Sequence, residues 1–263
     1  MAGKKFLPLL FNKSLASGLV PKHWKEGIIV PVLKPGKPLE LPDSYRPVTL
    51  TSNLCKLVER VVAQRIRDAV EERLLPYQAG FRPQRSTADP LVGLMPMISD
   101  RKPREKVDAV RIDYARAFDS VDHGWIIWTL EMYQVDGYIT RWVADFLTGR
   151  TSRVRIGHAM SDPAVFTCGV PQGSVLGPLL FIIVMDTLSV ELARIPGLEH
   201  ASFADHLIMV ARGETKEEVQ LTLQRGLDCI ERWTRSHFVE LSAPKTHTTH
   251  YLAHTPSTSY TCT

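Results

Sequence analysis

The 263-residue sequence lacks an apolar run long enough to span a bilayer, which takes about 18 consecutive apolar residues. Its best candidate, Leu179–Met185, stops at Asp186. The N-terminus is basic, but the apolar stretch that follows it ends at Asn12, so no secretory signal is predicted. We therefore expect an intracellular protein with no membrane partner.

Cysteine is scarce, and no two cysteines form a C-x-x-C pair. The chain has 4, and they are far apart in the sequence: Cys55, Cys168, Cys229 and Cys262. This usage predicts free thiols in a reducing compartment rather than a disulfide framework. Three histidines lie near the C-terminus without the paired cysteines of a zinc finger, so no zinc site is predicted at His247, His250 and His254.

The remaining composition is that of an ordinary globular protein, with 44% hydrophobic and 23% charged residues. It excludes collagen-like, coiled-coil and disordered classes for most of the chain. The charge is unevenly distributed, since residues 1–106 hold 19 Lys and Arg against 10 Asp and Glu, and residues 107–263 hold 13 against 18. The basic first part predicts contact with a polyanion, and the acidic second part predicts gathered carboxylates.

Strand and helix patterns are mixed irregularly along the chain. Short apolar or alternating runs predict strands at Gly27–Leu33, Tyr45–Pro47, Val107–Asp113, Ser152–Ile156, Phe238–Leu241 and Thr246–Leu252, with two more inside Glu199–Ala211. Apolar residues at helical spacing predict helices at Asn53–Leu74, Phe118–Met132, Tyr138–Leu147, Leu179–Leu192 and Thr215–Arg235. This mixture favours an α+β fold, and the charged segment Arg101–Lys106 is the best candidate for a boundary inside it.

Three segments together indicate chemistry. Asp113 ends an apolar strand, Gly169–Ser174 is a flexible turn, and Asp205 and His206 stand at a hairpin tip. Neighbouring strands lie about 4.8 Å apart, so two strand-end aspartates can meet. Two Mg²⁺ ions about 3.5–4 Å apart need such oxygens when they clamp a phosphoryl transfer. Each segment alone is weak evidence for catalysis. A strand-end aspartate, for example, is usually a turn residue.

Combined and in this order, the segments resemble the reverse transcriptase domain of non-LTR (LINE-type) retrotransposons, from about Trp24 to Leu252. The segments that resemble the fingers motifs of that family are Val30–Lys37, Ser44–Val48 and Tyr77–Arg82. Those that resemble the palm motifs are Ile112–Asp113 with Phe118–His123, Gly169–Phe181, Phe203–His206 and Lys245–Thr246.

The resemblance implies a right-hand polymerase with basic fingers and an acidic palm, whose antiparallel sheet is backed by helices, and with a missing or vestigial thumb. The expected divisions are an N-terminal extension (1–23), fingers (24–106), palm (107–254) and a frayed tail (255–263). The implied reaction is RNA-templated DNA synthesis, which extends a DNA primer with dNTPs. A nuclear location is expected from the family.

The resemblance also implies roles for individual residues. Two Mg²⁺ ions, or Mn²⁺, would be held by Asp113, Asp205 and the backbone carbonyl of Tyr114. Contacts to the incoming nucleotide would come from Lys34, Lys37, Arg46, Phe118, Gln172 and Gly173. Lys245 would protonate the pyrophosphate leaving group. Arg82 and Arg85 would contact the nucleic acid. Phe118 as a core residue and Lys245 as a surface lysine remain the alternatives.

One position departs from the family pattern. Reverse transcriptases of this kind have a second aspartate where this chain has His206. An imidazole removes one negative charge from a site for two dications and favours softer metals than Mg²⁺. We therefore expect impaired catalysis, and a catalytically inactive nucleic-acid-binding fragment is the alternative. A metal-dependent nuclease is a weaker hypothesis, because the segment Gly169–Phe181 would have no role in such an enzyme.

Overall fold

The computed structural model describes residues 2–100, 102, 104–115, 117–242 and 246–251. The chain forms two compact units, each discontinuous in sequence. Unit 1 comprises Met1–Leu74, Arg116–Met185 and His237–Val239, and unit 2 comprises Leu75–Ala115, Asp186–Ser236 and Glu240–Thr263. The expected division into fingers and palm at residue 106 stays a prediction.

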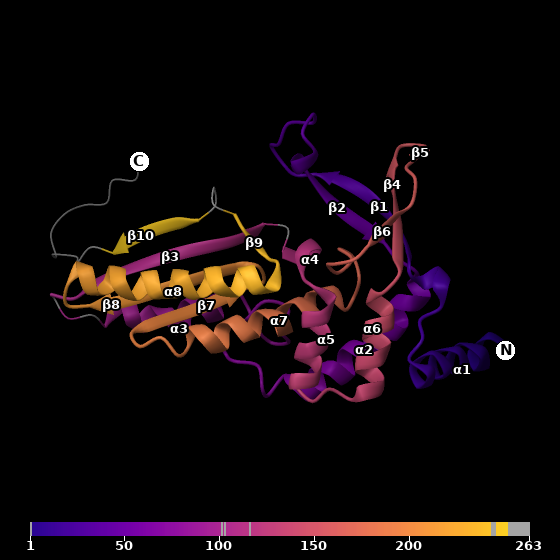
Figure 1. Cartoon of the computed structure of the whole chain (residues 1–263), viewed down its shortest axis with the longest axis horizontal. Helices are drawn as coiled ribbons and strands as arrows, with labels where there is room; N and C mark the ends of the chain where they lie inside the picture. The colour runs from indigo at the N-terminus through magenta and orange to yellow at the C-terminus, as the bar shows by residue number, and fades with distance from the viewer. Residues whose placement is uncertain (1, 101, 103, 116, 243–245, 252–263) are drawn as a thin grey trace. The chain divides into compact units, whose positions relative to one another are not determined.

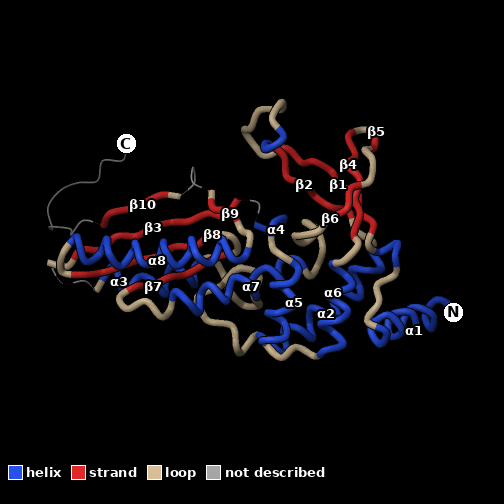
Figure 2. The backbone as a smooth tube through the Cα atoms, in the orientation of Figure 1, coloured by secondary structure: helices blue, strands red, loops and turns tan. Residues whose placement is uncertain are grey.

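Unit 1 contains a mixed sheet (Figures 1 and 2). Its strands are β1 (Glu26–Leu33), β2 (Tyr45–Leu50), β4 (Arg150–Ile156), β5 (Ala159–Met160) and β6 (Ala164–Phe166). They are ordered β2-β1-β4-β5, with β6 also paired to β4. The first two strands form a hairpin, because β1 and β2 pair antiparallel, whereas β1 and β4 run parallel.

Helices form in unit 1 where apolar periodicity predicts them, with one correction, and the helix over Ala2–Ser17 was not predicted. They are α1 (Ala2–Ser17), α2 (Asn53–Val70), α4 (Ala117–Ser120), α5 (His123–Met132) and α6 (Gly137–Leu147). The single helix predicted over Phe118–Met132 is wrong, because the Asp122 side chain accepts from the Trp125 N–H at 3.0 Å and starts a new helix there. Fully buried side chains of α6, including Trp142 and Phe146, form part of the hydrophobic core of unit 1.

Unit 2 contains an antiparallel sheet, as predicted. Its strands are β3 (Lys106–Ala115), β7 (Leu198–Phe203), β8 (His206–Gly213), β9 (Glu240–Leu241) and β10 (His247–Tyr251). They are ordered β10-β3-β8-β7, and β9 also pairs with β3. The hairpin of β7 and β8 turns at Ala204-Asp205.

Two helices cover opposite faces of this sheet (Figure 1). Leu94 of α3 (Ala88–Ser99) is buried with Ala109 and Val210 on one face. On the other face, Gly226 of α8 (Lys216–His237) approaches the side chain of Met209. Since side chains alternate along a strand, the apolar residues of β3 and β8 serve both faces. A further helix, α7 (Gly177–Leu192), belongs to unit 1 as far as Met185 and to unit 2 from Asp186.

Among the described residues, no helix is both long and apolar enough to cross a membrane. Three cysteines lie in the described part of the chain, and all three are free thiols, as predicted: Cys55, Cys168 and Cys229. Cys262 lies outside it.

Candidate active site

The predicted acidic residues meet at one end of the β3–β8 pair. Asp113 is the register partner of His206, and Asp205 directly precedes that histidine. Nδ1 of His206 lies 3.9 Å from Oδ2 of Asp113, and Nε2 lies 3.9 Å from Oδ1 of Asp205. The Asp113 side chain is 5% exposed, whereas those of Asp205 and His206 are 35% and 47% exposed. The imidazole of His206 thus lies beside both carboxylates.

Tyr114 points away from this site. Its side chain is buried in unit 2, and its hydroxyl has no hydrogen-bond partner among the described residues. Burial raises the pKa of that hydroxyl above its ordinary value. A role for Tyr114 therefore concerns only its backbone, as the resemblance implies.

The turn that carries Gln172 and Gly173 is docked onto β2 within unit 1. The Thr49 N–H donates to the Gln172 carbonyl at 2.7 Å. Gly173 has a φ of +127°, and a Cβ added to it would overlap the carbonyl oxygen of Thr49. Glycine is therefore required here by close backbone contact and by its conformation. The Gln172 side chain is held in turn, because Nε2 donates to both carboxylate oxygens of Asp119 at 3.2 and 3.0 Å.

A buried carboxylate supports the residues that follow this turn. Glu59 of α2 is fully buried, and its Oε2 accepts from the N–H groups of Val175 and Leu176 at 2.6 and 3.2 Å. Burial raises the pKa of the Glu59 carboxyl, although these donors and the buried Arg150 guanidinium act in the opposite direction. The sequence does not predict this contact between Glu59 and the N–H groups of Val175 and Leu176, because its pattern around Glu59 indicates only an amphipathic helix.

Phe118 lies in α4, half-buried, with its ring 4.6 Å from that of Phe181 between centroids. Phe181 is fully buried. This ring pair gives Phe118 a packing role, and its half-exposed state leaves part of the ring accessible. Both roles considered from the sequence are compatible with this position.

The predicted cations are placed differently from one another. Lys37, Arg46 and Arg85 are exposed, whereas Lys34 is half-buried and donates to the Asp43 carbonyl at 2.8 Å. Arg82 is only 8% exposed. It donates from Nη1 to the carbonyls of Leu75 and Gln78 at 2.7 and 3.2 Å, and its predicted contact with nucleic acid stays a prediction.

Several predicted residues lie outside the described part of the chain. Lys245 and His254 are among them, and so is the side chain of His250. His247 is exposed on β10 opposite Arg111. Among the residues that the structure describes, no three His, Cys, Asp or Glu side chains are grouped closely enough to hold a metal ion.

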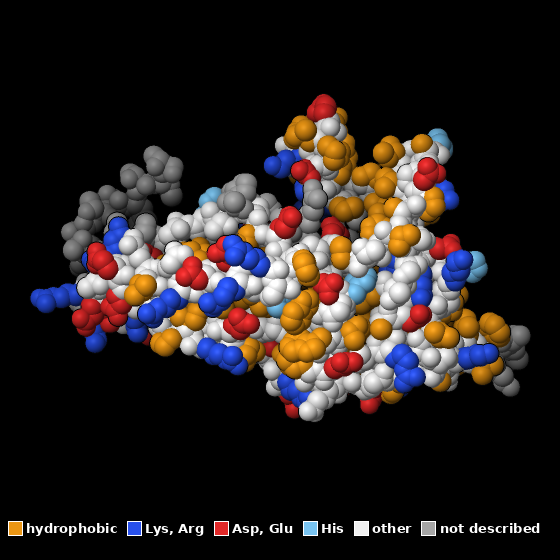
Figure 3. Space-filling model, in the orientation of Figure 1, with side chains coloured by type: hydrophobic (Ala, Val, Ile, Leu, Met, Phe, Trp, Pro, Cys, Tyr) orange, Lys and Arg blue, Asp and Glu red, His pale blue; other side chains and the backbone are white. Residues whose placement is uncertain are grey.

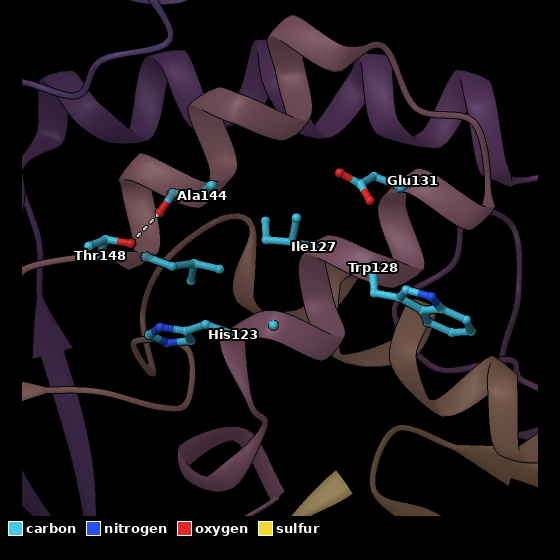
Figure 4. A pocket seen from close by; sticks show the side chains of 8 residues that line it. His123, Ile127, Trp128, Glu131, Ala144 and Thr148 are labelled. Carbon is cyan, nitrogen blue, oxygen red and sulfur yellow. Dashed lines mark hydrogen bonds between the residues drawn. The ribbon is translucent and has the colours of Figure 1, made fainter.

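Two further surface features belong to unit 1. Hydrophobic side chains gather over strands β1, β2 and β4–β6 (Figure 3), where Ile156 and Val165 are 69% and 67% exposed. A pocket of about 360 Å³ opens between α5 and α6 (Figure 4), lined by residues that include His123, Trp128 and Thr148. Neither feature contains a residue predicted for catalysis.

The chain shares its fold with a telomerase of known structure. Apo telomerase from Candida tropicalis, truncated from its C-terminal domain, is similar with a TM-score of 0.64 and 13% identity, over 96% of this chain and 56% of that one. The same telomerase in complex with a telomeric RNA fragment gives a TM-score of 0.65 and 12% identity, over 94% and 44%. This likeness shows the fold alone, and it is consistent with a right-hand polymerase.

The sequence comparison defines the family. Residues 32–261 match the family described as reverse transcriptase (RNA-dependent DNA polymerase), so the chain belongs to it. A probable RNA-directed DNA polymerase from transposon BS of Drosophila melanogaster is 34% identical over 92% of this chain. The RNA-directed DNA polymerase from mobile element jockey of the same fly is 29% identical over 92%. The resemblance to non-LTR retrotransposon reverse transcriptases is thereby confirmed, and the chain spans 27% of the length of each of these relatives.

Proposed function

We propose that this domain extends a DNA primer on an RNA template with dNTPs, and that His206 makes it slow. The observation that carries the proposal is the pairing of Asp113 with His206 directly beside Asp205, in a chain of the reverse transcriptase family. The basic residues of the fingers motifs support contact with a polyanionic template, because Lys37 and Arg46 are exposed.

The donor set fits the divalent ions that this family uses. Mg²⁺ takes one or two protein carboxylates and completes its shell with water and phosphate oxygens, which Asp113 and Asp205 can accommodate. The imidazole of His206 suits Mn²⁺ better than Mg²⁺. The residues that would hold the ions are therefore Asp113 and Asp205, with the backbone carbonyl of Tyr114. When bound, such ions stabilise the attacking and leaving oxygens of a phosphoryl transfer.

The other residues would bind and orient the reactants. Lys34, Lys37 and Arg46 would neutralise the triphosphate, as cationic clamps do in other phosphoryl transfers. The Phe118 ring would exclude the 2′-hydroxyl of a ribonucleotide by its bulk. Gln172 and Gly173 would lie against the nascent base pair, and Nζ of Lys245 would donate a proton to the departing pyrophosphate.

His206 is the reason that we expect slow synthesis. The family pattern has a carboxylate at this position, and an imidazole supplies no negative charge to balance a bound dication. We expect His206→Asp to raise the rate of primer extension by about tenfold or more, because charges that face the reacting phosphates carry much of the catalysis. The measurement is single-nucleotide extension of a DNA primer on an RNA template, in Mg²⁺ and in Mn²⁺.

The control is Asp113→Asn in the same background, which should abolish extension. A folded His206→Asp protein that is no faster than the parent in either metal would contradict the proposal.

His206 also favours a second function, namely nucleic-acid binding without synthesis. A titration of the parent against salt distinguishes the two functions, because phosphate contacts give a steep salt dependence whether or not the chain is active. Tight, salt-dependent binding combined with no extension by either protein would select the binding function.

A further inference from the structure

The hairpin that carries Asp205 has an unfavourable backbone conformation. Ala204, between β7 and Asp205, has a φ of 57°, in the left-handed region that residues with a Cβ rarely adopt. A residue keeps such a conformation only when its surroundings hold it there. The contacts of Ala204 therefore decide where the next two side chains, Asp205 and His206, are placed.

A buried glutamine supplies those contacts. Gln78 is 2% exposed, and its Nε2 donates to the Ala204 carbonyl at 3.2 Å. Its Oε1 accepts from the Ala204 N–H at 3.1 Å and from the Gly80 N–H at 2.8 Å. One carboxamide therefore satisfies both main-chain polar groups of the residue that precedes Asp205.

Backbone hydrogen bonds join the segment around Gln78 to the end of β7. The Ser202 N–H donates to the Tyr77 carbonyl at 2.7 Å, and the Ala79 N–H donates to the Ser202 carbonyl at 3.0 Å. A Cβ on Gly80 would overlap the backbone nitrogen of Ala204, so this approach is possible only with glycine. Arg82 donates to the Gln78 carbonyl and braces the same segment. All of these residues belong to unit 2.

We infer that Gln78 is a positioning residue of the candidate active site, which sets the direction of Asp205 and His206 through the backbone of Ala204. It touches neither substrate nor metal. A carboxamide both donates to a carbonyl and accepts from an N–H at this length, whereas an ionised glutamate lacks the donor, and methionine has no donor and only a weak sulfur acceptor. The catalytic meaning of this role rests on the proposed function, whereas the structural link between Gln78 and Ala204 does not.

The test compares Gln78→Met and Gln78→Glu with the parent. The matched control is Gln224→Met, because Gln224 is an exposed glutamine on α8 of the same unit, where it donates to Asp228 at 2.8 Å. Hydrogen exchange of the Ala204 amide, followed by NMR of ¹⁵N-alanine-labelled protein, should be about tenfold faster in Gln78→Met. It should stay near the parent value in Gln78→Glu, which keeps the acceptor, and in Gln224→Met.

Metal binding and catalysis provide the second readout. We expect both Gln78 variants to bind Mn²⁺, measured by electron paramagnetic resonance, about threefold or more weakly than the parent, because a small misplacement of a ligand is costly. In the His206→Asp background, both variants should lower kcat for primer extension while the KM for dNTP stays near its starting value.

Each outcome decides the proposal. Unchanged Ala204 exchange in a folded Gln78→Met protein would overturn it, and so would faster exchange with unchanged Mn²⁺ affinity. Loss of folding in both Gln78 variants would also overturn it, since Gln78 would then determine the fold instead of the site. If His206→Asp shows no extension at all, the proposed function fails, while the exchange and Mn²⁺ measurements still judge Gln78.

Discussion

Gln172 donates a hydrogen bond from one amide nitrogen to each carboxylate oxygen of Asp119. This contact ties the turn before α7 to the helix α4, both within unit 1. It gives Asp119 a function that the sequence motif alone does not disclose, because the motif was interpreted for its Phe118 ring. Asp119 restricts the side chain that would lie against the nascent base pair.

Asp119→Asn should weaken nucleotide binding. The variant keeps one oxygen acceptor but loses the charge that strengthens the bond to Gln172. We expect the KM for dNTP to rise by about three- to fivefold with little change in kcat, in the His206→Asp background, since the lost hydrogen bond is exposed. Steady-state incorporation of a single nucleotide measures both constants.

The control for this prediction is Asp162→Asn, since Asp162 is an exposed aspartate of the same unit. It should leave the KM unchanged. An Asp119→Asn protein with the parental KM would mean that the orientation of Gln172 does not matter to the nucleotide.

Phe118→Ala separates the two roles of the ring. Loss of the ring pair with Phe181 should lower the free energy of unfolding by about 1 kcal/mol. If the ring also excludes ribonucleotides, the preference for dNTP over rNTP should fall by about tenfold or more, by analogy with other steric pockets. Competition between dNTP and rNTP for incorporation measures this preference.

Phe181→Leu removes the same ring pair and serves as the comparison for Phe118→Ala. It should destabilise the protein and keep the preference for dNTP. Equal preferences in the parent and in Phe118→Ala would assign Phe118 to packing alone.

Glu59 should make stability depend on pH. Burial raises the pKa of its carboxyl above the ordinary 4.5, so folding favours the protonated form. The stability from this shift is fully present below about pH 4.5 and is lost as the pH rises through the raised folded pKa. Glu59→Gln lacks this titration, so the parent should lose stability relative to the variant as the pH rises. Urea unfolding at several pH values measures the difference.

Glu217→Gln is the matched control for Glu59→Gln, because Glu217 is an exposed glutamate in the first turn of α8. The Glu217→Gln protein should keep the loss of stability with rising pH that the parent owes to Glu59. A constant difference for Glu59→Gln would show that the buried carboxyl titrates in the folded protein as it does in the unfolded chain.

His200 predicts the opposite pH dependence. It is 2% exposed, its ring lies against that of Tyr77 at a tilt of 38° with centroids 4.3 Å apart, and burial lowers its pKa from 6.5 to about 4. The neutral form is favoured by folding, so the stability is present above pH 6.5 and is lost as the pH falls towards 4. A shift of this size corresponds to about 3 kcal/mol. His200→Phe keeps an aromatic ring at this position and should remove most of this loss.

His158 is exposed, so His158→Phe provides the control for His200→Phe. It should retain the acid-induced loss of stability of the parent. Identical unfolding free energies of parent and His200→Phe between pH 6.5 and 4 would contradict the prediction.

The regular elements that alternate or repeat strongly could be predicted from the sequence. Strand β3 and the β7–β8 hairpin follow from alternating apolar residues, and α2 follows from its helical spacing. Helix α3 could not be predicted, because Pro90, Gly93 and Pro96 indicate a loop. Its formation depends on tertiary contacts of Leu94 with the sheet.

The site could be predicted only where chemistry is carried by a motif. Asp113, Asp205 and His206 were singled out because the segments that carry them follow one another in the order of the reverse transcriptase family. Gln78 and Glu59 were not, because each acts on main-chain N–H groups 126 and 116 residues further along the chain. No pattern in a single sequence records such pairings.

The pairing of β3 with β8 runs without interruption from Lys106 opposite Gly213 to Asp113 opposite His206. Slippage by one residue would set Leu207 against Asp113 and turn the imidazole to the reverse side of the sheet. A single-base change can thus exchange histidine and aspartate at position 206 without altering the pairing of β3 with β8. Insertion or deletion of one codon within either strand would instead shift the register and separate Asp113 from His206.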